Sequence, residues 1–373
     1  MLVFIKNLFK VEFHQDRIYG LDLIRAIAII SVLLGHGSHI ITGEEGSLYY
    51  HAFTFLDGVF VFFVLSGFLI GGLLIYILEN KQINASTLFQ FWRRRLLRTL
   101  PAYYLILIVL TILSLLYASN FKISDSYRYY FLVQNFDRSH PFFFAEAWTL
   151  SIEVWFYIFI PLFIFIFKGF FKMSDKISII TAVIMFLALG FSVRLMRMGL
   201  PGLNGEAVDH LFRKQVLTRI DSVTMGVVGA YVYHYHKEFW LKFKNQFLIL
   251  GLLIFLYTKY PLFNHGNFYN LAMFYTLQSF SFLLIIPFFN EIKTGKGLFF
   301  RIMTVLSYVS FSIYLLNMNV VQVFILNRVD FGNLNDIYVN IIKYVLYLLL
   351  SVFGGILMYK FVELPFMKLR RSK

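Results

Sequence analysis

The sequence predicts an all-α membrane protein, a polytopic helical bundle of about ten transmembrane helices with both termini in the cytoplasm. Of the 373 residues, 59% are hydrophobic and 14% are charged, and the mean hydropathy is +0.71. Soluble domains have roughly 45–50% apolar residues. Apolar segments long enough to cross a bilayer recur along the chain. Most Lys and Arg residues gather in alternate connecting segments, which is typical of cytoplasmic loops.

The apolar segments define one transmembrane domain. Residues 1–20 are expected to form a cytoplasmic lead, 21–363 the membrane domain and 364–373 a basic cytoplasmic tail. This is the organisation of an integral multi-pass protein of the plasma (inner) membrane, surrounded by membrane lipid. The seventh segment is short for a span, so the number of spans is about ten. The spans are expected at about residues 21–41, 54–78, 99–118, 147–167, 177–196, 216–236, 247–258, 269–289, 302–327 and 338–362.

Charge and cysteine content exclude several classes of function. The net charge is +14, but the basic residues follow the membrane topology, so no nucleic-acid partner is expected. The chain has no cysteine, which excludes disulfides, thiolate metal sites and a cysteine acyl intermediate. We expect no metal, and chemistry that uses histidine, carboxylates, hydroxyls or the substrate itself.

The first span contains the most informative pair of residues, Arg25 and His36. Eleven helical steps of about 100° bring both side chains to one face, about 16 Å apart along the axis. Ionisable residues inside a membrane helix are costly and mark functional sites by default. Asp22, three residues before Arg25, is close enough to pair with it. The alternative is that both residues are structural: Arg25 would lie at the membrane interface, and His36 would make a hydrogen bond between helices.

The second span carries Asp57, Ser66 and several glycines. Small residues at Ser66, Gly67, Gly71 and Gly72 permit close approach between helices. Helix packing alone is a sufficient explanation of this pattern.

Four arginines, Arg93, Arg94, Arg95 and Arg98, precede the third span. Arg94 and Arg98 point the same way if the stretch is helical, and Pro101 is expected to interrupt the helix at the start of the span. Guanidinium groups bind phosphate oxygens with two hydrogen bonds, so the absence of lysine favours a phosphate partner. Ordinary cytoplasmic charge bias is the alternative.

The fourth span begins with a polar group of residues: Trp148, Ser151, Glu153 and Tyr157. An unpaired carboxylate at Glu153 would be costly in the membrane, so it needs either a structural cation or a substrate hydroxyl. Later spans contain Arg219 and Asp221, and then Ser307, Tyr308, Tyr314, Asn317 and Asn319. Both sets are also compatible with structural hydrogen-bond networks.

Taken in order, seven motifs from Leu21 to Leu369 resemble those of the acyltransferase 3 family of membrane acyltransferases, which largely O-acylate glycans. The family-defining element is an arginine and a histidine separated by ten residues. The motifs are LDLIRAIAIISVLLGH, GVFVFFVLSGFLI, FWRRRLLRTLPAYY, AWTLSIEVWFYIFIP, RIDSVTMGVVGA, SYVSFSIYLLN and FVELPFMKL.

The resemblance implies roles for five of these residues. His36 corresponds to the catalytic histidine, Arg25 to its partner, Arg94 and Arg98 to the basic residues after the second span, and Glu153 to the family's acidic residue. The sequence departs from the family at two places: Phe60 stands where an acid often precedes the Phe-Phe pair, with Asp57 one turn earlier, and the later Ser-Tyr-x-x-Tyr-Leu-x-His pattern ends in Asn317.

The function expected from these observations is transfer of an acyl group, most simply acetyl from acetyl-CoA, to a hydroxyl of a glycan or lipid-linked sugar. His36 would act as general base, with Tyr157 or Tyr314 stabilising the oxyanion. The CoA phosphates would bind the arginine cluster. A covalent acyl-histidine is a variant of this mechanism.

Two other classes of function remain at this point. A transporter or flippase would use the same charges to line a pathway for an anionic lipid or sugar, without dependence on CoA. A structural scaffold does not account for the aligned Arg25 and His36.

Overall fold

The computed structural model describes residues 17–42, 48–118, 121–259, 266–332 and 334–369, and these ranges contain helices and no strand. The all-α prediction is confirmed. Parts of the predicted lead and tail, residues 1–16 and 370–373, lie outside the described residues. The long helices are α2 (Tyr19–Thr42), α4 (Gly58–Asn80), α5 (Ala85–Tyr117), α7 (Ala147–Gly169), α8 (Asp175–Arg197), α10 (Val216–Tyr235), α12 (Lys244–Lys259), α13 (Phe274–Asn290), α14 (Gly297–Leu316) and α15 (Asp336–Met358).

Short helices and π-helical turns complete the chain. A π-helical segment continues α14 over Asn317–Ile325, and another continues α15 over Tyr359–Glu363. The short helices are α3 (Leu48–Thr54), α6 (Tyr127–Tyr130), α9 (Gly205–Val208), α11 (Lys237–Lys242) and α16 (Leu364–Leu369), together with the π-helical turns Asp209–Arg213 and Tyr269–Met273.

Within the described ranges, eight helical segments are long and apolar enough to cross a membrane. The predicted number of about ten is not confirmed, and the orientation of the termini stays a prediction. The other two predicted spans form α10 and α12: α12 has 16 residues, about 24 Å of helix, and α10 carries buried Arg219 and Asp221. The eight segments are 19–41, 50–80, 85–117, 147–169, 175–197, 269–290, 297–328 and 336–369.

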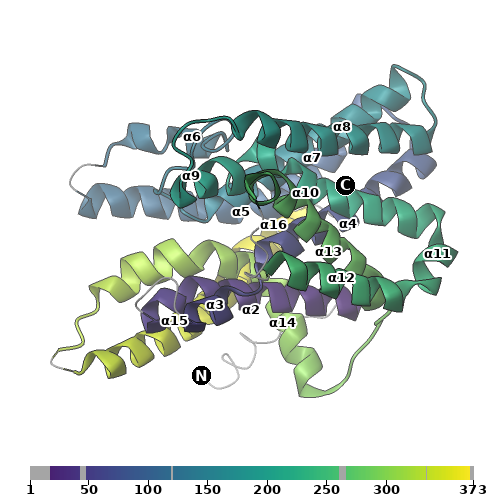
Figure 1. Cartoon of the computed structure of the whole chain (residues 1–373). Coiled ribbons are helices and arrows are strands. Elements are labelled where there is room, and N and C mark those ends of the chain that lie inside the picture. The colour runs from purple at the N-terminus through teal and green to yellow at the C-terminus, as the bar shows by residue number, and fades with distance from the viewer. Residues whose placement is uncertain (1–16, 43–47, 119–120, 260–265, 333, 370–373) are drawn as a thin grey trace.

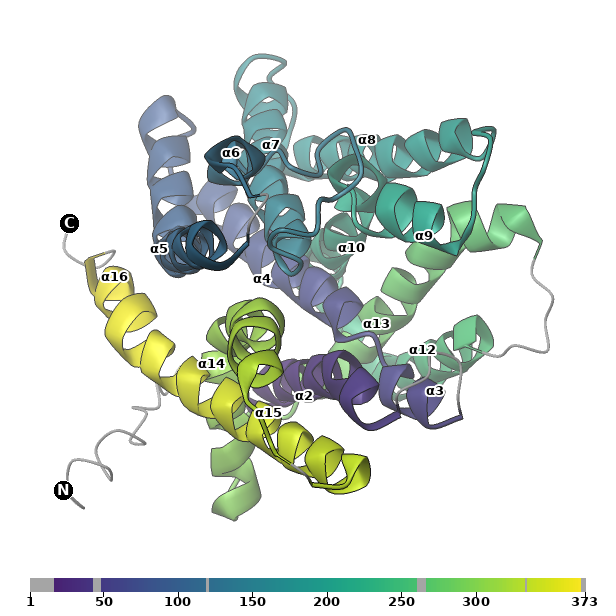
Figure 2. The same ribbon diagram turned by 90° about the vertical axis from the view of Figure 1, so that its left-hand side faces the viewer.

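The helices form two groups that lie one above the other in Figure 1. Helices α5 to α10 make the upper group, whereas α2, α3, α12, α14 and α15 make the lower one. Figure 2, turned by 90°, shows α4 and α13 running between them. The most extensive helix pair is α4 with α10, and α2 packs mainly on α14. The two groups thus meet along α4.

Two glycines bring α4 and α10 into backbone contact. A Cβ atom on Gly67 would lie 1.8 Å from the carbonyl oxygen of Val223, and one on Gly226 would lie 2.0 Å from that of Val64. No larger residue fits at either position. The small residues of the second span therefore serve close helix packing, as the sequence indicated.

Helix α5 does not break at Pro101, contrary to the prediction. It runs from Ala85 to Tyr117 as one helix of 33 residues with the proline inside, about 50 Å long. Proline is tolerated in membrane helices because neighbouring groups satisfy the freed carbonyl. The arginine cluster therefore lies on the same helix as the third span.

Candidate active site

A cavity lies inside the bundle between α2, α4, α5, α7 and α14. It holds about 850 Å³ of space not occupied by atoms, part of it open to solvent. Its lining along α4 extends from Val59 in the first turn to Ile70, which is about 16 Å of helix. Seven residues singled out from the sequence line it: Arg25, Ser66, Arg95, Arg98, Glu153, Tyr157 and Tyr314.

The remaining predicted site residues lie elsewhere. They are not part of the cavity lining, although His36 and Asp22 belong to α2, as Arg25 does. These residues are Asp22, His36, Asp57, Arg93, Arg94, Trp148, Ser151 and Asn317.

The arginine cluster divides between two faces of α5. Arg95 and Arg98 are half-buried and line the cavity, whereas Arg93 and Arg94 are exposed. We expected Arg94 and Arg98 to act together, but the two arginines that line the cavity are Arg95 and Arg98, three residues apart. Because Arg25 lines the same cavity, three guanidinium groups face one enclosed space.

Asp22 is occupied by a different arginine from the one expected. Arg17 Nε donates to Asp22 Oδ2 at 2.9 Å, and Ser307 Oγ donates to Asp22 Oδ1 at 2.7 Å. The guanidinium of Arg17 also lies 4.0 Å from the centre of the Tyr308 ring. The Arg25 guanidinium approaches Asp22 only to 3.7 Å, which is an ion pair without hydrogen-bond distance. Arg25 therefore keeps donors available toward the cavity.

Glu153 is held by hydroxyl donors. Ser66 Oγ donates to Glu153 Oε1 at 2.9 Å, and Tyr157 OH donates to Oε2 at 2.8 Å. The carboxylate also interacts electrostatically with Arg25 and Arg98. Three cations and one carboxylate in a low-dielectric space leave a positive excess, which favours an anionic ligand.

His36 lies beside one end of the cavity. Its ring centroid is 6.4 Å from that of Tyr314, which lines the cavity. Its Nδ1 is 2.7 Å from Asn317 Oδ1, and its backbone carbonyl accepts a hydrogen bond from Gln322 Nε2 at 2.9 Å. Arg25 and His36 thus sit on one unbroken helix, with Arg25 at the cavity and His36 next to its far end.

A charged cluster lies at the N-terminal end of α4. Asp57 caps the helix by accepting the Val59 N–H at 3.0 Å, and its other oxygen pairs with Arg213 at 2.9 Å. Arg213 also pairs with Asp209 at 3.2 Å and lies 5.8 Å from the Trp148 ring. Burial lowers the pKa of Arg213, but the two carboxylates outweigh it, so the pKa is raised. Asp57, Arg213 and Lys214 interact electrostatically with His36.

Two predicted residues have structural partners. Ser151 is buried and accepts a hydrogen bond from Gln134 Nε2 at 2.6 Å, and Trp148 packs edge-on against Phe63. These contacts fasten α7 to the loop before it and to α4.

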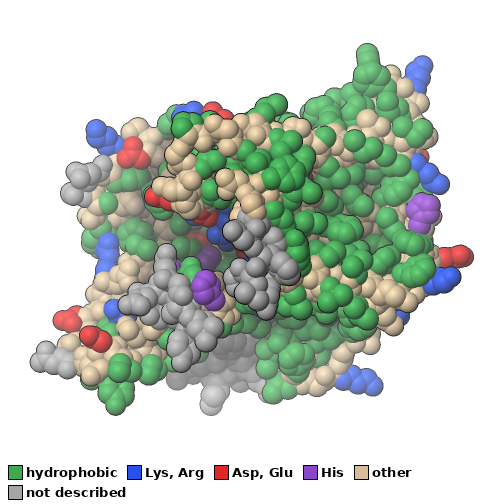
Figure 3. Space-filling model, in the orientation of Figure 1, with side chains coloured by type: hydrophobic (Ala, Val, Ile, Leu, Met, Phe, Trp, Pro, Cys, Tyr) green, Lys and Arg blue, Asp and Glu red, His purple; other side chains and the backbone are tan. Residues whose placement is uncertain are grey.

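In the orientation of Figure 3, the face shown is hollowed between the two groups of helices, and basic, acidic and histidine side chains lie in the hollow.

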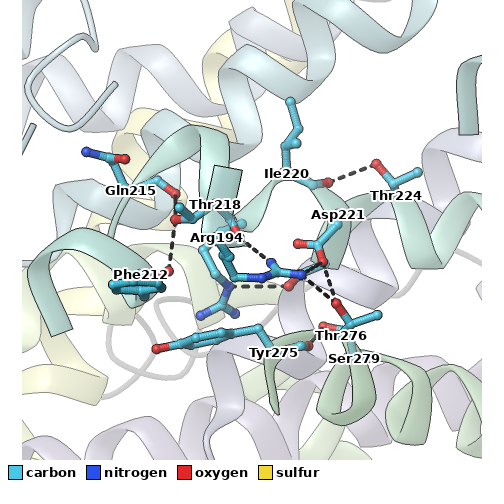
Figure 4. A network of polar contacts seen from close by, with 12 residues as sticks. Arg194, Phe212, Gln215, Thr218, Ile220, Asp221, Thr224, Tyr275, Thr276 and Ser279 are labelled. Atoms are coloured by element: carbon cyan, nitrogen blue, oxygen red, sulfur yellow. Dashed lines mark hydrogen bonds and ion pairs between the residues drawn. The ribbon is translucent and has the colours of Figure 1, made fainter. Parts of the chain in front are cut away.

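Sequence analysis missed the partner of Asp221. Arg194 Nη2 donates to Asp221 Oδ2 at 2.7 Å and to Thr276 Oγ1 at 2.6 Å, while its Nη1 donates to the Thr218 carbonyl (Figure 4). Arg194 and Asp221 are 0% and 1% exposed. Arg219 packs its guanidinium 4.2 Å from the Phe60 ring centre. The only signal in the sequence was an arginine inside the fifth apolar segment.

Glu146 is a second buried carboxylate that sequence reasoning did not single out. Its Oε1 accepts the backbone N–H groups of Met318 and Asn319 at 2.9 and 3.0 Å. Burial, which outweighs these hydrogen bonds, raises the pKa of Glu146 to about 7. Glu146 thereby anchors the start of α7 to the turn that carries Asn317.

Comparison with known proteins identifies the family of the chain. The sequence profile of an acyltransferase domain, acyltransferase 3, matches residues 18–360. The chain belongs to the acyltransferase 3 family. The resemblance noted in the sequence is confirmed, and the eight helical segments long enough to cross a membrane agree with an integral multi-pass membrane protein.

Two relatives of this acyltransferase 3 protein carry informative names. It is 27% identical over 240 residues to the peptidoglycan O-acetyltransferase OatA of Listeria monocytogenes, a match covering 61% of this chain and 36% of the relative. It is 25% identical over 373 residues to the O-acetyltransferase OatA of Staphylococcus aureus, covering 94% of this chain and 57% of the relative. The chain spans about a third to just over half of the length of the curated relatives it matches. No solved structure matches it.

Proposed function

We propose that this protein transfers an acetyl group from acetyl-CoA to a hydroxyl of a cell-envelope glycan or lipid-linked sugar, with His36 as general base. The observation that carries the proposal is the cavity, whose lining includes three arginines and also Tyr314, the ring of which lies beside His36. The names of the relatives, one of them a peptidoglycan O-acetyltransferase, support a glycan acceptor.

The arginines suit the CoA end of the donor. Arg95 and Arg98 face the cavity and Arg25 adds a third guanidinium. Guanidinium groups bind phosphate oxygens with paired, charge-assisted hydrogen bonds. Because Tyr314 lines the same cavity, the pantetheine arm would follow it past Phe62, Leu69 and Phe311. The thioester would thereby reach the vicinity of His36.

The chemical step is a direct acyl transfer. His36 takes the proton of the acceptor hydroxyl while the hydroxyl oxygen attacks the thioester carbonyl. The tetrahedral intermediate then collapses, the C–S bond breaks, and the proton passes from His36 to the CoA sulfur. Tyr314 is a lining residue close to His36 whose hydroxyl could stabilise the oxyanion, but that hydroxyl donates to the Glu146 carbonyl at 3.2 Å, so it would have to exchange that partner.

The test is acetyl transfer by the purified protein in lipid nanodiscs, with labelled acetyl-CoA and soluble glycan acceptors. His36→Gln is expected to lower turnover by roughly 10²–10⁴-fold, the usual contribution of a general base. His39→Gln is the matched control, because His39 is an exposed histidine one turn along the same helix. Full turnover by a well-folded His36→Gln protein would contradict the proposal. Movement of a sugar substrate across the bilayer without thioester consumption would indicate a transporter instead.

A further inference from the structure

The hydrogen bonds around Asn317 fix the orientation of its side-chain amide. Asn317 Nδ2 donates to the carbonyls of Ile313 at 3.2 Å and Tyr314 at 2.7 Å. Both amide hydrogens are therefore used within the last turn of α14. The amide oxygen is left facing the other way, where it meets two further groups.

One of these groups is the hydroxyl of Tyr347 on α15. Tyr347 OH donates to Asn317 Oδ1 at 3.1 Å, and its side chain is fully buried. The ring packs on the backbone of α2 next to His36: a Cβ atom on Gly37 would lie 2.7 Å from Tyr347 Cε1. Turning the amide over would place its NH₂ group against this donor. The absence of a side chain at Gly37 thus leaves room for Tyr347, which in turn holds Asn317.

The second group is Nδ1 of His36, 2.7 Å from the same oxygen. An amide oxygen has no hydrogen to give, so Nδ1 must carry the proton of this hydrogen bond. A neutral imidazole protonated at Nδ1 has its lone pair on Nε2. The hydrogen-bond chain from Tyr347 through Asn317 to His36 therefore selects one tautomer.

We propose that Asn317, oriented by Tyr347, is a positioning residue that holds His36 as the Nδ1–H tautomer, so that Nε2 is the atom that takes the proton from the acceptor hydroxyl. The proposal rests on the function proposed above for His36. It also gives a specific role to position 317, where the family pattern has a histidine: the amide oxygen of Asn317 can only accept a hydrogen bond, so it determines which nitrogen of His36 carries the proton.

A charge placed beside His36 would change its protonation, so the contact with Asn317 can be tested by substitution. The charged groups that interact with it are Asp57 on α4, Arg213 in the π-helical turn and Lys214 after it, and the titratable side chains nearby are Tyr314 and, through Asn317, Tyr347. A carboxylate in place of the amide would stabilise the protonated imidazole, because an opposite charge within about 4–6 Å favours the charged form. Asn317→Asp is thus a change of charge at constant shape.

The first test observes the tautomer directly and needs no activity. The full chain is labelled with ¹⁵N-histidine, reconstituted in lipid and studied by solid-state NMR, and the His36 signals are identified as those lost in His36→Gln. We expect the Nδ1–H form in the wild type and a mixture of tautomers in Asn317→Leu. An Nε2–H form in the wild type would overturn the proposal.

The second test uses kinetics. Asn317→Leu is expected to lower turnover by roughly 10–100-fold with an unchanged KM for acetyl-CoA, as for the loss of about 1.5–3 kcal/mol from one functional hydrogen bond. Asn317→Asp is expected to remain active and to move the acid limb of the pH–rate profile to higher pH. Tyr347→Phe, which removes only a hydroxyl, is expected to give a smaller loss and serves if Asn317→Leu does not fold.

The control is Asn319→Leu. Asn319 lies on the same π-helical segment, but its amide binds the backbone of Ala145 and Phe143. The Asn319→Leu variant should retain the wild-type tautomer of His36 and the wild-type pH–rate profile. An equal shift of the profile in Asn319→Leu and Asn317→Asp would reduce Asn317 to a structural residue and overturn the proposal. Loss of transfer in His36→Gln is a separate result, so an active His36→Gln protein would reject the proposed function while the NMR result still decides the tautomer.

Discussion

Two groups of charged residues in this bundle, the Arg194–Asp221 network and the cavity lining, are built on opposite principles. In the network of Arg194 and Asp221, the guanidinium donates to a carboxylate, a hydroxyl and a carbonyl, and no part of either side chain is more than 1% exposed. In the cavity, Arg25, Arg95 and Arg98 line the same space as one carboxylate, Glu153, whose oxygens accept hydrogen bonds from Ser66 and Tyr157.

The difference separates a structural polar cluster from a binding site. A charge buried in a membrane protein is costly, so it is either paired inside the protein or kept for a ligand. Arg194 shows the first solution, whereas the cavity arginines outnumber the one carboxylate that lines the cavity with them, which is the arrangement expected of a binding site. The positive excess therefore says more about function than the number of charged residues does.

The largest effect should follow from breaking the paired network. Arg194→Met leaves Asp221 buried without a cation and is expected to cost about 3–5 kcal/mol of unfolding free energy, measured by denaturation in mixed micelles. Asp221→Asn should behave similarly. The double variant Arg194→Met with Asp221→Leu should recover much of the loss, since an ion pair is often replaced by apolar residues at little cost. A stable single variant would show that the pair is dispensable.

A smaller effect, on binding and not on stability, is expected in the cavity. Arg98→Gln should raise the KM for acetyl-CoA by roughly tenfold to a hundredfold, because charge-assisted hydrogen bonds contribute about 1.5–3 kcal/mol. Its unfolding free energy should change less than in Arg194→Met, since Arg98 is half-buried and both carboxylates that interact with it, Glu153 and Glu363, also accept hydrogen bonds from hydroxyl groups. Arg94→Gln on the exposed face of the same helix is the matched control and should leave KM unchanged. Equal effects of the two variants would remove the distinction between the two faces of α5.

A pH-dependent effect is expected for Glu146, a buried carboxylate with neither a paired cation nor a place in the cavity lining. Its pKa of about 7 lies above the ordinary value, so the folded protein binds a proton there that the unfolded chain releases. Stability should therefore fall as pH rises from about 4.5 to 7. Melting curves across this range should show the decline in the wild type and a flatter dependence in Glu146→Gln. An unchanged slope in the variant would assign the decline to other groups.

The sequence predicted the fold class and much of the site because both depend on regular patterns. Hydropathy located the long helices, and the eleven-residue spacing placed Arg25 and His36 on one helix, as α2 shows. Seven of the predicted polar residues meet in one cavity, because the motifs that carry them lie on helices that pack together.

What could not be predicted depends on helix rotation and on distant contacts. Packing determines which face of α5 points into the bundle, so Arg95 lines the cavity and Arg94, which we expected at the site, is exposed. Asp22 binds mainly Arg17, which precedes the helix, and Arg194 reaches Asp221 from another helix. Helix α5 continues through Pro101, which local propensity alone argues against.

The glycine contact between α4 and α10 gives the cavity one wall that cannot yield. Gly67 and Gly226 leave no gap between the two backbones, and Ser66, which holds Glu153, is the residue next to Gly67. The opposite wall is α5, which packs mainly on α7 and on the end of α15. A displacement of α5, which packs less extensively than α4 and α10 do on each other, would therefore widen the cavity for a long, flexible donor most easily, and the arginines on that helix would move together with the molecule they bind.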